Sequence, residues 1–151
     1  MNMNNFFSSE LHNEKTFYQA FLTDLENCRD EVIIESPYIT SDRVNQFIPL
    51  FEKLIDKGVR IYILTRDPKE HSESMEIQSE EAIRSFEILG VQTLLCVGNH
   101  HRKLAILDRK ILWEGSLNIL SQTKSKEIMR RIDSKEFAME MFNFLRLGKY
   151  V

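Results

Sequence analysis

One stretch of the chain, HRKLAILDRKILWEGSLN, combines the side chains that a reaction at a phosphate group requires. It brings together an imidazole, an ammonium, a carboxylate, a hydroxyl and an amide, on His101, Lys103, Asp108, Ser116 and Asn118. An imidazole can act as a nucleophile or a general acid, and an ammonium neutralises anionic oxygens. Hydroxyl and amide groups donate hydrogen bonds to oxygens whose negative charge grows in the transition state. The stretch therefore indicates phosphoryl chemistry.

The spacing also predicts that these groups converge. Residues two apart in a strand share a face, so His101 and Lys103 project together, as do Ser116 and Asn118. Strands are expected at 103–107 and 110–113, and the turn between them brings the two halves of the stretch side by side.

The stretch has the spacing HxK(x)4D(x)6GSxN, which is the signature of the phospholipase D superfamily. Six fixed identities in this order arise by chance in such a chain with a probability on the order of 10⁻⁶. The chain most resembles the small single-motif bacterial endonucleases of that superfamily. It is also similar, through VIIESPYIT and SKEIMRRI, to nuclease domains attached to helicases and restriction enzymes.

The resemblance implies a metal-independent phosphodiesterase that needs no cofactor. In such enzymes the motif histidine attacks phosphorus and forms a phosphohistidine, and a histidine from a second motif protonates the leaving oxygen. Carried over, His101 is the nucleophile or the general acid, and Lys103, Ser116 and Asn118 hold the phosphate. Asp108 belongs to the catalytic motif, and its expected role is structural or electrostatic support.

Family members often carry a glutamate downstream of GSxN that orients the motif histidine, and Glu127 is the candidate here. A carboxylate on one ring nitrogen fixes the tautomer and leaves the other nitrogen free. Only one motif is present, whereas the family site uses two histidines and two lysines. We therefore predict a homodimer with the site across its two-fold axis.

Charge favours nucleic acid as the substrate. The formal net charge is -3, but residues 99–131 hold eight basic and three acidic side chains, whereas 66–87 hold three basic and seven acidic ones. A basic surface around the site attracts a polyphosphate backbone. The leading hypothesis is an endonuclease with little sequence specificity, because no base-reading helix or zinc finger is visible. The alternatives are a phospholipase D-type lipid phosphodiesterase or transphosphatidylase, and a non-catalytic nucleic-acid-binding module of a larger defence or repair complex, beside a helicase or restriction-type partner.

Composition sets the wider frame. A chain of 151 residues that is 42% hydrophobic predicts one globular domain over 1–151. Two cysteines exclude a disulfide scaffold, and no metal-binding motif is present. Without a signal peptide or a long apolar run, we expect a cytoplasmic protein that makes no stable membrane association.

Hydrophobic periodicity predicts an α/β fold, a mixed β-sheet flanked by helices on both faces, as in the phospholipase D-like sandwich. Expected helices cover 12–28, 44–55 and 77–89, and a last helix follows a capping box formed by Asp133 and Glu136. Further strands are expected at 32–34, 59–64, 91–97 and 128–132. Residues 1–10 are predicted to be an adaptable start, and 66–76 an exposed loop.

Five other side chains near these elements invite a functional interpretation. His12 and His71 are expected to be solvated, and His100 to face away from His101 because it is one residue out of phase. Tyr38 is expected to pack rather than contact substrate, and Trp113 to lie in the core.

Overall fold

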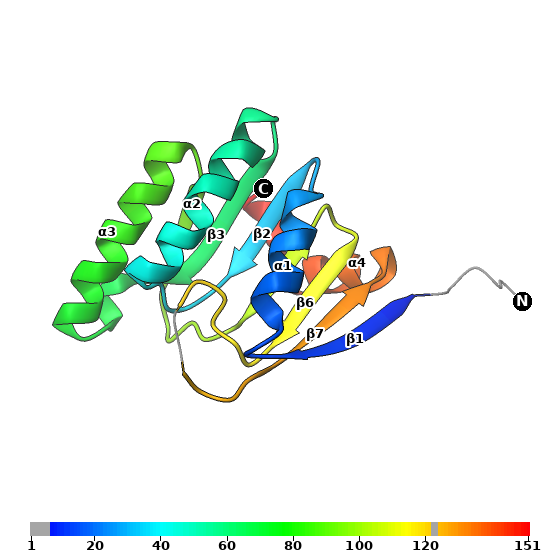
Figure 1. Cartoon of the computed structure of the whole chain (residues 1–151). Coiled ribbons are helices and arrows are strands. Elements are labelled where there is room, and N and C mark those ends of the chain that lie inside the picture. Colours follow the sequence, from blue (N-terminus) through cyan, green and yellow to red (C-terminus); the bar gives the residue numbers. More distant parts are fainter. Residues whose placement is uncertain (1–6, 122–123) are drawn as a thin grey trace, which may run out of the picture.

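A seven-stranded sheet organises the computed structural model, which describes residues 7–121 and 124–151 (Figure 1). Its strand order is β1-β7-β6-β5-β2-β3-β4. The strands are β1 Ser8–Asn13, β2 Glu31–Glu35, β3 Arg60–Arg66, β4 Gln92–Cys96, β5 Leu104–Leu107, β6 Ile111–Gly115 and β7 Ile128–Asp133. Strands β2, β3 and β4 are parallel, and all other pairings are antiparallel. The predicted mixed sheet is confirmed.

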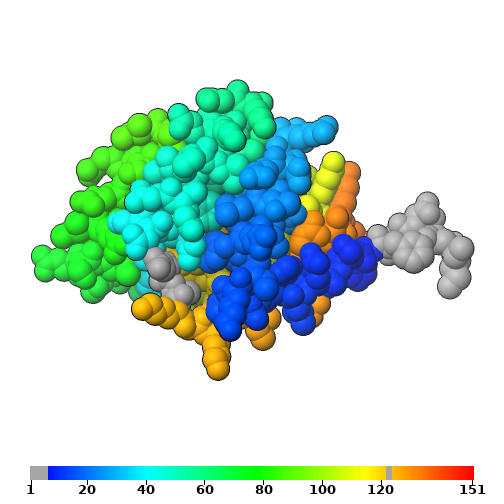
Figure 2. All heavy atoms as spheres, in the orientation of Figure 1, coloured from blue at the N-terminus to red at the C-terminus, as the bar shows by residue number. Residues whose placement is uncertain are grey.

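Helices cover both faces of the sheet, as predicted. The first three, α1 Phe17–Glu26, α2 Ser41–Asp56 and α3 Glu73–Leu89, share one apolar core with alternate residues of the central strands. Figure 2 shows this side of the molecule, with the three helices laid over the sheet. The fourth helix, α4 Lys135–Phe144, packs with the short helix η2 Leu147–Lys149 on the opposite face. Among the described residues, no helix is long and apolar enough to cross a membrane.

Strand β2 shows why the two cores form. Its side chains alternate, so that Val32 and Ile34 enter the core beneath α1 and α2, while Ile33 enters the core beneath α4. All three are fully buried. A central strand covered on both faces needs an unbroken apolar run, which is the pattern that predicted it.

The prediction of an adaptable start was wrong for residues 8–10, whereas residues 1–6 lie outside the described part of the chain. Residues 8–13 form an edge strand that pairs antiparallel with β7, from Ser8 opposite Asp133 to Asn13 opposite Ile128. Their side chains are largely exposed and carry no strong alternation. Backbone pairing with a strand about 120 residues later holds this segment, and local sequence gives no signal for it. Helix α1 accordingly begins at Phe17 rather than at residue 12.

Three other boundaries differ from the predictions. The expected loop at 66–76 contains a short helix, η1 Pro68–Glu70, and the start of α3. The Asp133–Glu136 capping box is wrong, because the Ser134 hydroxyl accepts the Phe137 N–H at 3.2 Å and Asp133 still belongs to β7. Helix α2 begins at Ser41 rather than at residue 44, and Pro49 lies inside it.

Candidate active site

Both halves of the polar stretch lie at the edge of the sheet where the parallel strands end. Strands β2, β3 and β4 end at this edge, and β5 begins there because Leu104 pairs with Glu35. Strand β6 returns to the same edge, where Gly115 pairs with Met129 near the start of β7. The segments that carry the two halves of the motif therefore meet at the carboxyl ends of the parallel strands, a frequent place for sites in α/β proteins.

His101 and Lys103 lie in contact just before β5. The Lys103 Nζ is 2.8 Å from the His101 Nδ1 and 2.8 Å from the His101 carbonyl oxygen. The neighbouring ammonium is the main cause that lowers the pKa of His101, and burial, Arg66 and His100 act in the same direction. The pKa of Lys103 is itself lowered by burial, against the opposing charge of Glu127. The imidazole is thus held in its neutral form, which a nucleophile requires.

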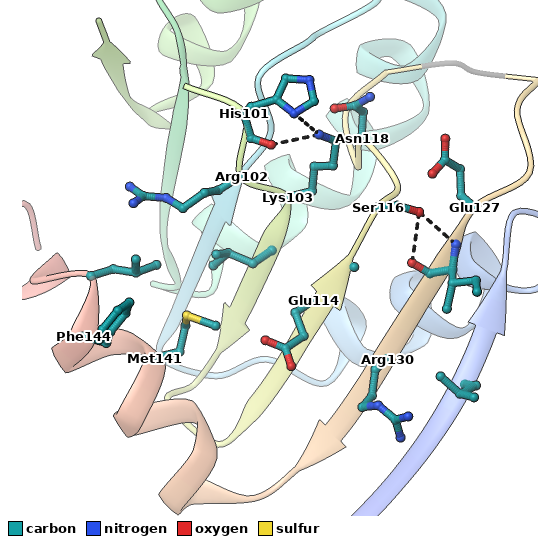
Figure 3. A pocket seen from close by; sticks show the side chains of 15 residues that line it. His101, Arg102, Lys103, Glu114, Ser116, Asn118, Glu127, Arg130, Met141 and Phe144 are labelled. Carbon is teal, nitrogen blue, oxygen red and sulfur yellow. Dashed lines mark hydrogen bonds between the residues drawn. The ribbon is translucent and has the colours of Figure 1, made fainter. Parts of the chain in front are cut away.

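The GSxN segment follows β6 and faces this pair. A Cβ on Gly115 would lie 2.1 Å from the Ile128 carbonyl oxygen and 2.9 Å from the Met129 Cα, so only glycine fits against β7. The Ser116 hydroxyl accepts the Ile128 N–H at 3.0 Å. The Asn118 Oδ1 is buried and has no hydrogen-bond partner among the residues that the structure describes. In Figure 3 the Asn118 amide and the Lys103 ammonium point toward the same space as the His101 ring.

Residues far away in sequence anchor this segment from behind. The Tyr18 hydroxyl donates a hydrogen bond to the Ile119 carbonyl at 2.8 Å, and the Ser36 hydroxyl accepts the Leu120 N–H at 3.1 Å. Burial raises the pKa of Tyr18 to about 12, partly offset by the Arg43 guanidinium stacked on its ring. Sequence reasoning missed these anchors because α1 and the end of β2 precede the segment by about 80–100 residues.

The two side chains on either side of His101 in the sequence, those of His100 and Arg102, point away from the motif side chains and contact a buried carboxylate. Glu35 is fully buried, and its Oε1 lies 3.2 Å from the His100 Nε2 and 3.2 Å from an Arg102 amino nitrogen. The prediction that His100 faces away from His101 is confirmed, and its partner is Glu35. This alternation aims His101 and Lys103 outward while the neighbouring side chains hold the segment down.

The predictions for two other histidines were wrong. His71 is only partly exposed, and its ring centroid lies 5.1 Å from that of Tyr38, whose own ring meets His101 edge-on at 6.1 Å. Burial, with Arg66, lowers the pKa of His71. His12 packs on the Trp113 ring at 5.2 Å, and Trp113 is fully buried as expected.

Asp108 lies at the other end of β5, away from the groove that the motif residues line. Its carboxylate accepts the backbone N–H groups of Arg29, Asp30 and Glu31 at 2.9, 2.8 and 2.9 Å, so it ties the β5–β6 turn to the start of β2. Although Asp108 belongs to the catalytic motif, the fold does not bring it to the other motif residues, so it is not a catalytic residue within this chain. Its carboxylate is a structural support, which is the role expected for it.

Glu127 lies beside the site but not on His101. Its side chain lines the same groove as the motif residues. No hydrogen bond joins it to His101 among the described residues, and its charge acts on Lys103. Within one chain, the hydrogen bond by which Glu127 was predicted to orient His101 is not formed.

A groove of about 880 Å³ joins these groups to the open face of the sheet beside α4. At one end it is lined by His101, Lys103, Ser116, Asn118 and Glu127. Apolar side chains also line it, from Leu11, Ile128, Met141, Phe144 and Leu145. Among residues 7–121 and 124–151, no group of three or more His, Cys, Asp or Glu side chains is placed to hold a metal ion.

Comparison with known proteins agrees with this geometry. The profile of the family described as "Cardiolipin synthase, PLD-like domain" matches residues 21–146. Nuc from Salmonella typhimurium, described as a phospholipase D family member, superposes with a TM-score of 0.74 at 14% identity, over 93% of each chain. NucT from Helicobacter pylori gives 0.69 at 16% identity, over 93% of this chain and 94% of its own.

A more distant likeness is to the archaeal chromatin protein TrmBL2. Its TM-score is 0.59 at 12% identity, over 98% of this chain and 55% of that one. No curated protein sequence matches significantly. With a family profile that spans most of its length and a fold shared with Nuc and NucT, the chain belongs to the phospholipase D-like family of phosphodiesterase folds.

Proposed function

We propose that the protein is a metal-independent endonuclease that cleaves phosphodiester bonds through a phosphohistidine on His101. One observation carries the proposal: His101, Lys103, Ser116 and Asn118 converge on one end of the groove. There an imidazole of lowered pKa meets an ammonium, and the Asn118 amide points toward the same space. A phosphate oxygen is the group that an ammonium and an amide N–H together would bind.

The proposed reaction has two displacements at phosphorus. A ring nitrogen of neutral His101 attacks phosphorus, the bond to the leaving oxygen breaks, and that oxygen takes a proton from His101 of the partner subunit, which enters the reaction as an imidazolium. Water then attacks phosphorus, the bond from phosphorus to His101 breaks, and the proton of the water passes to the partner subunit's His101. One ring is again neutral and the other is again protonated. In the structure the Lys103 ammonium hydrogen-bonds to the His101 ring and to the His101 carbonyl oxygen. On substrate binding this ammonium moves to a phosphate oxygen.

The requirement for a second histidine leads us to propose a homodimer. Three apolar side chains that line the groove, Leu11, Ile128 and Phe144, are 61%, 62% and 82% exposed. Large apolar side chains left exposed next to a site often mark an interface. A second copy placed over this groove would cover them and bring the two sites together, and the carboxylate that orients His101 would come from Glu127 of the partner subunit.

Two observations support nucleic acid over lipid as the substrate. Arg130 also lines the groove, so a cation lies beyond the phosphate end on the path that a polymeric anion would follow. TrmBL2, which shares the fold, is described by its mode of DNA binding. The family description names a cardiolipin synthase, which keeps lipid transfer as the second candidate.

The test is cleavage of single-stranded DNA, duplex DNA and RNA in excess EDTA. His101→Ala and Lys103→Met should abolish turnover, and Lys110→Met, which removes an exposed ammonium from the turn at the far end of β5, should not. Phosphoenzyme trapped by acid quench should be absent from His101→Ala. Release of headgroup from phospholipid vesicles without cleavage of any nucleic acid would overturn the proposal in favour of lipid transfer. Nucleic-acid binding that survives His101→Ala, with no turnover by the wild type, would indicate a non-catalytic module.

A separate measurement tests the dimer. Sedimentation and cleavage assays on the same dilution series should show that activity falls as the dimer dissociates. A fully active monomer would refute the shared site.

A further inference from the structure

The backbone that delivers His101 passes through an unusual turn. Between β4 and His100, Gly98 and Asn99 both have positive φ angles, of 89° and 59°. Consecutive residues in this region are uncommon, and a non-glycine residue there is tolerated mainly when it is asparagine or aspartate. Such a turn persists only where its surroundings hold it.

A carboxylate from outside the turn holds it in place. The two oxygens of Glu70 accept the N–H groups of Gly98 and Asn99 at 3.0 and 2.9 Å. Successive N–H groups in such a turn form a concave site for an anion, and Glu70 fills it from within the protein. These two hydrogen bonds, with the charge of Arg66, lower the pKa of Glu70, so the carboxylate is ionised at neutral pH.

Arg66, at the end of β3, locks the carboxylate and the turn together. Its guanidinium donates to the Glu70 carbonyl at 3.2 Å and to the Asn99 side-chain oxygen at 3.0 Å. Its Nε lies 3.5 Å from a Glu70 carboxylate oxygen. A further contact of 3.4 Å reaches the hydroxyl of Tyr38, the residue whose ring meets His101 edge-on. The cluster therefore holds both the backbone before His101 and the surface on which its ring rests.

We propose that Glu70, locked by Arg66, is a positioning residue that sets the place of the His101 imidazole for attack on phosphorus. This role rests on the proposed function of His101. Neither residue is among those that line the groove. The segment that carries Ser116 and Asn118 is anchored separately, through Tyr18 and Ser36. Loss of the Glu70 clamp should therefore impair the chemical step far more than phosphate binding.

The test compares Glu70→Gln with Glu73→Gln. Both replace a carboxylate by its nearly isosteric amide, but Glu73 is exposed in the first turn of α3. In Glu70→Gln one amide oxygen must replace two carboxylate oxygens, and the NH₂ group opposes a backbone donor. We expect kcat to fall by about 10- to 100-fold with KM changed less than about threefold, as a displaced reacting group produces. Glu73→Gln should match the wild type.

A second readout does not depend on turnover. Amide hydrogen exchange of Gly98 and Asn99 should accelerate by at least about tenfold in Glu70→Gln, and the His101 ring resonances should shift, whereas Glu73→Gln leaves both unchanged. Unchanged exchange or an unchanged kcat would overturn the inference. If the wild type cleaves no phosphodiester, the proposed function fails while exchange still tests the clamp.

A gentler variant covers the case in which Glu70→Gln does not fold. Arg66→Lys keeps the positive charge but loses the planar fork that bridges Glu70 and Asn99. It should show the same kcat loss and exchange increase at smaller size, and a wild-type kcat in this folded variant would refute the clamp.

Discussion

Replacing Asp108 with asparagine should cost stability rather than catalysis, although the residue belongs to the motif. Its carboxylate accepts three backbone N–H groups at 2.8–2.9 Å from the segment that starts β2. Asparagine keeps one acceptor oxygen and, like aspartate, tolerates the residue's φ of 52°. The substitution therefore isolates the loss of charge and of the second acceptor oxygen.

The magnitude follows from these contacts. Hydrogen bonds to a charged group contribute about 1.5–3 kcal/mol each, and contributions that share one acceptor do not add fully. We expect a loss of about 2–3 kcal/mol, which for a chain of this size lowers the midpoint of thermal unfolding by roughly 4–12 °C. The kcat per folded molecule, measured well below that midpoint, should stay within about twofold of the wild type.

The assay pairs thermal unfolding with nuclease turnover, and Asp30→Asn serves as the matched control. Asp30 is exposed beside the same segment, so its replacement should leave the unfolding midpoint within about 1 °C. A kcat loss of more than about tenfold with an unchanged midpoint would refute the structural role and return Asp108 to the catalytic set.

Three further outcomes are expected. Lys103→Met should raise the pKa of His101, because the ammonium that lowers it most is removed; a proton NMR titration of His101 that shows no upward shift would contradict this origin. Phe144→Asp should give a folded monomer with little activity by sedimentation and cleavage assays, since this exposed ring lies on the proposed interface, and a persistent active dimer would argue against that surface. Trp113→Phe removes the hydrogen bond of 2.8 Å to Asp24. Denaturant titrations should show a free energy of unfolding lower by about 1.5–3 kcal/mol, with kcat unchanged. A much smaller loss would show that the bond contributes little.

The elements that sequence predicted well are those whose signal is local. Strand β2 carries an unbroken apolar run, and α2 carries a clean apolar stripe that ends before Gly58, so side-chain period alone indicated both. Strand β1 has no such pattern and exists because its backbone pairs with β7. Its formation depends on a contact between the two ends of the chain, which no window of sequence contains.

The candidate site also has some features that follow from local sequence and others that depend on long-range contacts. The spacing of His101, Lys103, Ser116 and Asn118 predicted their convergence, because strand alternation and a short turn are local geometry. The orienting bond predicted between Glu127 and His101 is not formed within one chain, since the start of β7 carries Glu127 toward Lys103 instead. Asp108 shows the limit of motif spacing, because five residues after Lys103 along a strand is the far end of the sheet.

The candidate reactive groups, an imidazole, an ammonium, a hydroxyl and an amide, can be recognised in the sequence, because residue types and motif spacing are properties of the covalent chain. What holds these groups in place becomes visible in the folded structure. Glu35 beneath the motif, Tyr18 behind Asn118 and Glu70 at the turn before His101 come from separate elements. They meet because parallel strands end at one edge of the sheet, and that proximity is a property of the packed fold rather than of any segment.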